Sequence, residues 1–149
     1  MLPNLVLATL MMTLTVVIHF VGLIVLIRIL EWRGHRLRAH ASRLGQGALL
    51  ILVVLGLVAI HSAEIWAYAV LYILIGAVPD FESALYFSTV AFSSLGYGDI
   101  VLSPKWRLLS AIEAVNGLIL IGWSTAFLLS LMGKLRALEH EWLEQDRRD

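Results

Sequence analysis

The stretch that decides the fold reads Ser93-Ser94-Leu95-Gly96-Tyr97-Gly98-Asp99. Two glycines separated by one residue, with an acid directly after them, break any helical or strand periodicity. Glycine enters left-handed backbone conformations at little cost, which other residues do not. Gly96 and Gly98 therefore permit a backbone that alternates between ordinary and left-handed residues.

Long apolar runs flank this segment. The 149 residues are 60% hydrophobic and 15% charged, with a mean hydropathy of +0.86, whereas soluble domains carry about 45–50% apolar and about 25% charged residues. The apolar residues gather in three runs, near 5–30, 48–78 and 108–132. Each run is long enough to cross a bilayer as a helix. The sequence therefore predicts an all-α membrane protein with three transmembrane helices.

The segment between the second and third runs is too short to cross a membrane. Pro79-Asp80 is expected to end the second helix, and Ser103-Pro104 to begin the third. Residues 81–93 are apolar and compatible with a short re-entrant helix that Asp80 caps. Irregular backbone at membrane depth survives only where it is buried in protein or lines a water-filled path. A chain this small predicts assembly of several copies around a shared axis.

Basic residues set the expected orientation, because Lys and Arg concentrate in cytoplasmic loops. Four arginines lie between the first and second runs, and four basic residues follow the third. The segment between the second and third runs has only Lys105 and Arg107. The N-terminus is therefore expected outside and the C-terminus in the cytoplasm. The predicted organisation is an N-terminal transmembrane helix at 1–30, a basic cytoplasmic loop at 31–47, a module of two spans with the short helix and glycine segment between them at 48–133, and a short cytoplasmic tail at 134–149.

The glycine segment can bind a bare monovalent cation. Carbonyl oxygens that face one axis replace the hydration shell of the ion. Tyr97 would point away from that axis and brace the loop, and the Ser94 hydroxyl could add an oxygen at the inner end. The short helix would direct its C-terminal end, which carries about half a negative charge, toward the ion.

These residues resemble the potassium-channel signature Thr-Thr-Val-Gly-Tyr-Gly-Asp. The resemblance extends to Ala84-Leu85-Tyr86-Phe87-Ser88 as pore helix and to Pro104-Lys105-Trp106-Arg107-Leu108-Leu109 as the start of the inner helix. It covers about residues 48–133 and implies the two-helix pore module of that family, with one extra N-terminal helix. It also implies a homotetramer that conducts K⁺ passively through filter residues Ser94, Leu95, Gly96, Tyr97 and Gly98, with K⁺ as the permeant ion and no cofactor.

Two positions depart from the signature. Ser94 stands where Thr is usual, and Leu95 stands where β-branched Val is usual, so the side chain behind the filter is less restricted. Both changes favour an alternative, a poorly selective monovalent cation channel of the same fold. A further alternative is a non-conducting sensor or assembly subunit built on the pore module.

Other polar residues lie inside the predicted spans, where ionisable groups are costly and often functional. His61 and Glu64, three residues apart, form either a proton or ion sensor or a buried hydrogen-bonded pair. Glu113 is expected to contact the back of the pore helix as a structural acid; the alternative is that Glu113 or Asn116 adds negative potential to the ion path. Gly117 falls where many family members have a hinge glycine; it permits either bending or close packing.

Further site residues follow from spacing and resemblance. Asp99 is expected to hydrogen-bond Tyr86 or to attract cations to the pore mouth. The candidate cavity-lining residues are Leu118, Ile121, Gly122 and Thr125.

Composition also bounds the function. The net charge is +0 and the chain has no cysteine, so nothing points to a nucleic-acid partner, a thiolate metal site or a cysteine nucleophile. No enzyme motif is expected, and the partners expected are copies of the same chain, the bilayer and K⁺. No arginine-rich voltage-sensing helix is found, since Arg28 alone lies in the first run. The small size suggests a bacterial inner membrane.

Overall fold

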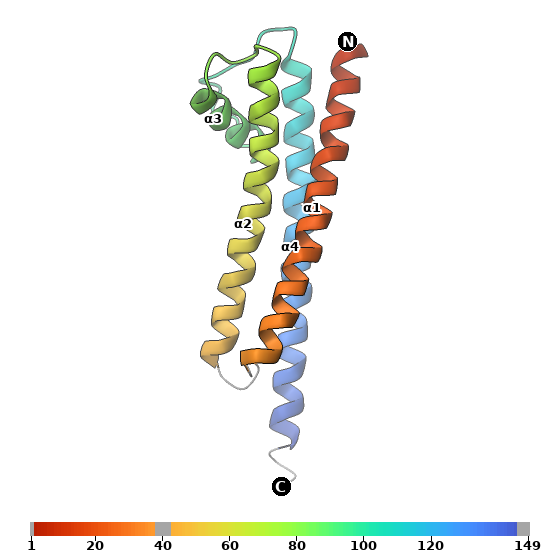
Figure 1. The fold of residues 1–149 in the computed structure, drawn as a ribbon, viewed down its shortest axis with the longest axis vertical. Helices are drawn as coiled ribbons and strands as arrows, with labels where there is room; N and C mark the ends of the chain where they lie inside the picture. Colours follow the sequence, from red (N-terminus) through yellow and green to blue (C-terminus); the bar gives the residue numbers. More distant parts are fainter. Residues whose placement is uncertain (1, 38–42, 146–149) are drawn as a thin grey trace.

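The computed structural model describes residues 2–37 and 43–145, with side chains for residues 2–32, 45 and 47–133. Within this part the regular structure is helical: α1 (Leu2–Leu37), α2 (Arg43–Leu74), α3 (Phe81–Phe92) and α4 (Arg107–Gln145). The three long helices run side by side, and the short α3 lies against the end of the bundle that holds the N-terminus (Figure 1). The predicted all-α fold, with three long helices and a short one between the last two, is confirmed.

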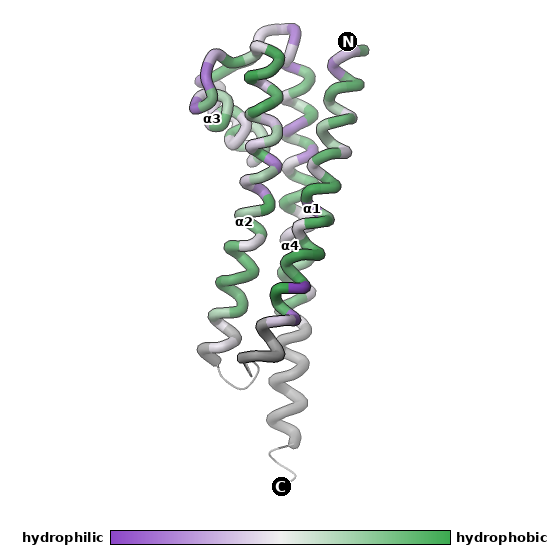
Figure 2. The backbone as a smooth tube through the Cα atoms, in the orientation of Figure 1, coloured by the Kyte–Doolittle hydropathy of each residue, from purple (hydrophilic) through white to green (hydrophobic). Residues whose placement is uncertain are grey.

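In the part of the chain that the structure describes, three segments are long and apolar enough to cross a membrane: Leu2–Trp32, Gly47–Leu74 and Arg107–Gly133. Figure 2 shows that hydrophobic residues cover these helices along most of their length. Many apolar side chains point outward, among them Leu10 at 61% and Val58 at 56% exposure. Such a surface suits a hydrocarbon environment rather than water. The chain is an integral membrane protein.

The helix bounds differ from the sequence-based expectation at the connection between α1 and α2. Residues 31–47 were expected as a loop, but α1 continues to Leu37 and α2 already begins at Arg43. The apolar spans still end near the expected bounds, at Trp32 and Gly47. Residues 38–42 of this connection and 146–149 of the tail lie outside the described residues.

A Schellman motif ends α2 before the expected position at Pro79-Asp80. The Ala77 amide donates to the Tyr72 carbonyl (2.9 Å) and the Gly76 amide to the Ile73 carbonyl (3.0 Å). Gly76 has φ +63°, the left-handed conformation that this cap requires. The helix therefore ends at Leu74, and the glycine followed by a proline was the sequence signal for it.

Local hydrogen bonds set where α3 and α4 begin. The Asp80 side chain accepts a hydrogen bond from the Ser83 amide at 2.9 Å, so the predicted cap of α3 is confirmed. The predicted start of α4 at Ser103-Pro104 is early. The Trp106 amide bonds to the Ser103 carbonyl in a turn, and the helix begins only at Arg107.

Helix α1 packs against α2 and α4 through one face. Its buried residues recur at three- and four-residue spacing, the pattern of a helix-packing face: Ala8, Met11, Thr15, His19, Leu23 and Leu26. Gly22 and Gly56 allow the close approach, since a methyl group at either would lie 2.6 Å from an atom of Ile60 or Leu26 across the interface.

Candidate functional site

The glycine segment has left-handed backbone at every second residue. Ser94, Gly96 and Gly98 have φ values of 56°, 61° and 76°. The segment between 95 and 98 has no helical or strand structure. The alternation that Gly96 and Gly98 permit is therefore present, and it begins one step earlier, at a residue that is not glycine.

Ser94 adopts this conformation because it ends α3. The Leu95 amide donates to the Val90 carbonyl (3.0 Å) and the Ser94 amide to the Ala91 carbonyl (2.9 Å), which together form a Schellman cap. Ser94 takes the position usually held by glycine. Its hydroxyl donates to the Ala114 carbonyl of α4 at 3.3 Å, which joins the N-terminal end of the glycine segment to that helix.

The outer end of the segment is fixed by Asp99. The Tyr86 hydroxyl, on α3, donates to an Asp99 carboxylate oxygen at 2.6 Å, and the Ile100 amide donates to the other oxygen at 3.0 Å. The bond from Tyr86 lowers the pKa of the Asp99 carboxyl below its ordinary value. The same bond raises the pKa of Tyr86. This hydrogen bond thus joins α3 to the residue directly after Gly98.

Glu113 of α4 lies against the back of α3 and is completely buried. One carboxylate oxygen accepts from the Ser88 hydroxyl of α3 at 2.6 Å, and the other accepts from the Tyr72 hydroxyl of α2 at 2.5 Å. Ser88 also contacts the Ile65 carbonyl of α2 at 3.0 Å. The acid and its partner Ser88 therefore join α2, α3 and α4.

A family model described as an ion channel matches residues 47–134. This is more than half of the chain, and it covers α2, α3, the glycine segment and the membrane-spanning part of α4. The chain belongs to this ion channel family. Searches of curated proteins and of solved structures gave no match. Helix α1 precedes the matched residues.

Gly117 brings two parts of this ion channel into direct contact. A methyl group on Gly117 would lie 2.1 Å from the carbonyl oxygen of Phe92, the last residue of α3. Bending and close packing were the two roles considered for this glycine, and its contact with Phe92 supports close packing. By comparison, a methyl group on Gly122, one and a half turns farther along α4, would meet nothing within 4 Å.

We expect Gly117→Ala to destabilise the channel strongly. The obstructing atom belongs to a backbone carbonyl and cannot move aside. The free energy of unfolding should therefore fall by about 1–3 kcal/mol or more, the loss typical of overpacking. Thermal unfolding in detergent would measure it, with Gly122→Ala as the matched control on the same helix. Equal melting temperatures for the two variants would contradict the contact.

We expect Tyr86→Phe to make the channel less tolerant of acid. A lowered pKa of Asp99 contributes stability that is complete above the pKa of the unfolded chain, about 3.9, and is lost as the pH falls through the folded value. Without the Tyr86 hydroxyl the folded pKa should rise, so the acid-induced loss of ion flux should begin at higher pH. Identical acid profiles for wild type and Tyr86→Phe would contradict this, and Asp99→Asn should lack the transition.

The candidate cavity residues lie on one exposed face of α4. Leu118 is 63% exposed, Gly122 and Thr125 are exposed, and Ile121 is half-buried. Their neighbour Ser124 points the other way and is buried. The single chain thus leaves this face of α4 open.

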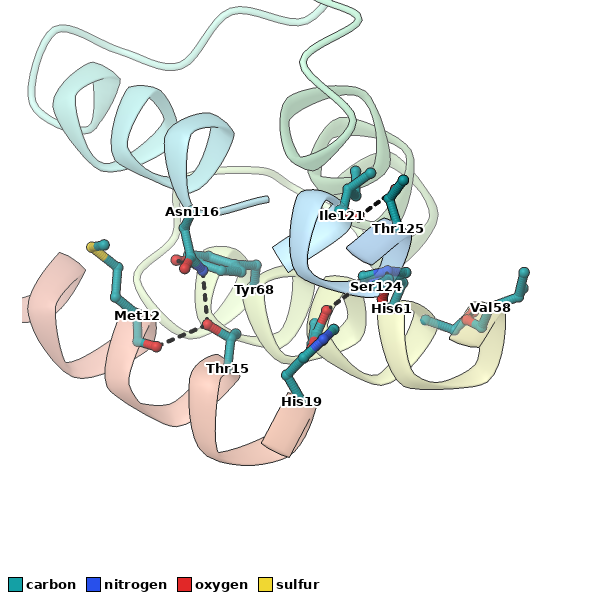
Figure 3. Close-up of polar contacts among 12 residues, drawn as sticks. Met12, Thr15, His19, Val58, His61, Tyr68, Asn116, Ile121, Ser124 and Thr125 are labelled. Atoms are coloured by element: carbon teal, nitrogen blue, oxygen red, sulfur yellow. Dashed lines mark hydrogen bonds and ion pairs between the residues drawn. The ribbon is translucent and has the colours of Figure 1, made fainter. Parts of the chain in front are cut away.

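Two polar groups between the helices include residues that sequence reasoning did not select. His61 and Glu64 are joined by a third residue, His19 of α1, which bonds to the same carboxylate. Asn116 donates to the hydroxyls of Thr15 and Tyr68, at 2.7 and 3.3 Å, and so joins α1, α2 and α4 (Figure 3). The sequence did offer one signal: His19 and Thr15 are polar residues four apart on a mostly apolar helix. Their partners become clear only from the packing of α1 against the other helices.

Proposed function

We propose that the chain is one subunit of a homotetrameric, potassium-selective channel. The observation that carries the proposal is the left-handed backbone at Ser94, Gly96 and Gly98. Alternation of this kind allows successive carbonyl oxygens to face the same side, where they replace the water around a K⁺ ion. The ion is the substrate of the pore, and the backbone of this segment is its binding site.

Assembly is supported by the surface that one chain leaves uncovered. Leu95 and Tyr97 expose 54% and 67% of their surface, although both are large side chains within the filter segment. The exposed face of α4 adds Val115, Leu118 and Leu129 at helical spacing. A single loop can also provide oxygen ligands on only one side of an ion. Neighbouring copies would cover these surfaces, and the number four follows from the resemblance to potassium channels.

The surrounding residues would hold the filter in a conducting shape. Asp99 and Tyr86 fix its outer end to α3, while Ser94 fixes its inner end to α4. Glu113 and Gly117 set the distance between α3 and α4. With Asp80 capping its N-terminus, α3 ends at the filter, so its carbonyl end would favour a cation there. Passive conduction then requires no cofactor and no chemical step.

The membrane placement follows from the basic residues. Arg33, Arg36, Arg38 and Arg43 lie between the first and second spans, and four basic residues follow the third. This distribution supports an outside N-terminus and a cytoplasmic C-terminus. The filter would then open to the outside through Asp99.

A poorly selective cation pore is the second candidate. Ser94 occupies a left-handed conformation that favours glycine, and its hydroxyl is already bonded to Ala114. The Leu95 side chain lacks the β-branch that would restrict it. A looser filter would pass Na⁺ as well as K⁺.

Ion flux into liposomes that contain the purified protein tests both candidates. Potassium flux that sodium cannot replace, abolished in Gly96→Asp, supports the proposed function. Equal fluxes of both ions, also abolished in Gly96→Asp, would favour the poorly selective pore. No flux of either ion from a tetrameric preparation would contradict both and favour a non-conducting subunit.

A further inference from the structure

Glu64 lies at the centre of a buried cluster formed by α1, α2 and α4. One carboxylate oxygen is 2.9 Å from Nδ1 of His19, and the other is 2.8 Å from Nδ1 of His61. Nε2 of His61 is 3.0 Å from the Ser124 hydroxyl of α4. Figure 3 shows His19, His61 and Ser124 converging from their three helices. His19 and Glu64 are fully buried, and the side chain of His61 is 18% exposed.

The hydrogen bonds constrain where protons reside. An ionised carboxylate only accepts hydrogen bonds, so each histidine must present a hydrogen on Nδ1. If both rings were neutral, the cluster would carry a net charge of −1 among apolar helices. One further proton makes the cluster neutral and removes the large cost of an uncompensated buried charge.

The surroundings also indicate which ring accepts that proton. Nε2 of His19 is buried and has no hydrogen-bond partner, so a hydrogen there would remain unsatisfied, at a cost of about 1–3 kcal/mol. Nε2 of His61 faces the Ser124 oxygen, which can accept its hydrogen. The proton belongs to the three groups jointly, with His61 as its favoured position.

No other charged group in the described residues pairs with the cluster. From α4 it is faced by Ser124 and by the ring of Trp123, 5.1 Å from that of His19. From α3 it is faced by Phe92, whose ring is 5.7 Å from that of His61. The next acid on α4, Glu113, is bonded to Ser88 and Tyr72 instead. In the described residues, the groups at this place in the bundle that can exchange a proton are therefore His19, Glu64 and His61.

The cluster touches the two elements that would control conduction. Phe92 ends α3 two residues before Ser94, and its carbonyl lies against Gly117. Ser124 is on the α4 face directly behind the candidate cavity positions. His61 thus contacts both the last residue of α3 and the buried face of α4.

We propose that His19, Glu64 and His61 form an intramembrane proton-binding site that regulates conduction through the channel. Histidine is the side chain that changes charge between about pH 5 and 8. The regulatory part rests on the proposed function, whereas proton binding does not. A divalent metal would need both Nδ1 atoms free of hydrogen and would leave the cluster with a net positive charge, so the proton is favoured.

The test combines two measurements on the full-length protein in lipid. Histidine ¹⁵N resonances would report ring protonation from pH 5 to 8, in a variant with His35, His40 and His140 replaced by Gln so that only His19 and His61 contribute. Ion flux would be measured over the same range in wild type and in His61→Gln, which can keep bonds to Glu64 and Ser124. Glu64→Gln is a second variant in case His61→Gln does not fold.

We expect the His61 signals to titrate and the flux to change about fivefold or more across this range, with a flat profile in the variants. Signals that do not change, or a wild-type flux profile that persists in His61→Gln, would overturn the proposal. A third outcome would replace the proton site by a metal site. In it, the flux does not depend on pH when a chelator is present, the flux changes when Zn²⁺ is added, and Zn²⁺ shifts the resonances of both histidine rings. Equal K⁺ and Na⁺ flux with the pH dependence intact would support the proton site and count only against the proposed selectivity.

Discussion

Gly96→Val should reduce potassium flux to the level of empty liposomes. Gly96 has φ +61°, where a non-glycine residue costs about 1–2 kcal/mol and a β-branched residue more. Four copies around one axis would accumulate at least about 4–8 kcal/mol of strain at the ion-binding site. The backbone can relieve that strain by leaving the left-handed conformation, which would turn carbonyl oxygens away from the ion.

Gly76→Val is the matched control for this experiment. Gly76 has nearly the same φ, +63°, and in both glycines an added methyl group would meet nothing within 4 Å. It lies at the end of α2, outside the filter. We expect this variant to lose stability and to keep its ion selectivity. Normal potassium flux in Gly96→Val, from a tetrameric preparation, would contradict the assignment of the filter.

Glu113→Ala should destabilise the channel by about 2–4 kcal/mol, because the change removes a buried acceptor of two hydrogen bonds and leaves a cavity. The Tyr72 hydroxyl would lose its partner in the interior, while Ser88 would keep its contact with the Ile65 carbonyl. The melting temperature in detergent and the ratio of K⁺ to Na⁺ flux should both fall, since α3 would be held less firmly behind the filter.

Glu113→Gln is the conservative comparison, because an amide retains one acceptor for the two hydroxyl groups and can donate to the other. It should recover most of the lost stability. If Glu113→Ala and Glu113→Gln were both as stable and as selective as wild type, the acid would not be the link between the three helices. If the alanine variant kept its stability and lost conduction, Glu113 would instead act on the ion path.

Much of the fold could be predicted because its signals are local. Apolar runs identify the three spans, and a short apolar segment with Asp80 before it identifies α3. The ends of helices were less predictable. Gly76 ends α2 through a left-handed cap, and Trp106 forms a turn before α4, so Pro79 and Pro104 did not mark the boundaries.

The candidate site was predictable only where backbone conformation decides it. Gly96 and Gly98 predict left-handed backbone because they are glycines. Ser94 gives no such indication, because its left-handed conformation comes from the cap of α3. The partners of Glu64 and Asn116 depend on which face of α1 packs inward. Several faces of such a uniformly apolar helix would fit the sequence, and the contacts of His19 and Thr15 appear only once the three helices are packed.

The reversal potential of the purified channel in a planar bilayer tests the central claim most directly. With potassium on one side and an equal concentration of sodium on the other, a filter of carbonyl oxygens from Ser94 to Gly98 predicts a potential displaced strongly toward the potassium equilibrium value. Cation currents that reverse near zero under the same conditions would contradict potassium selectivity.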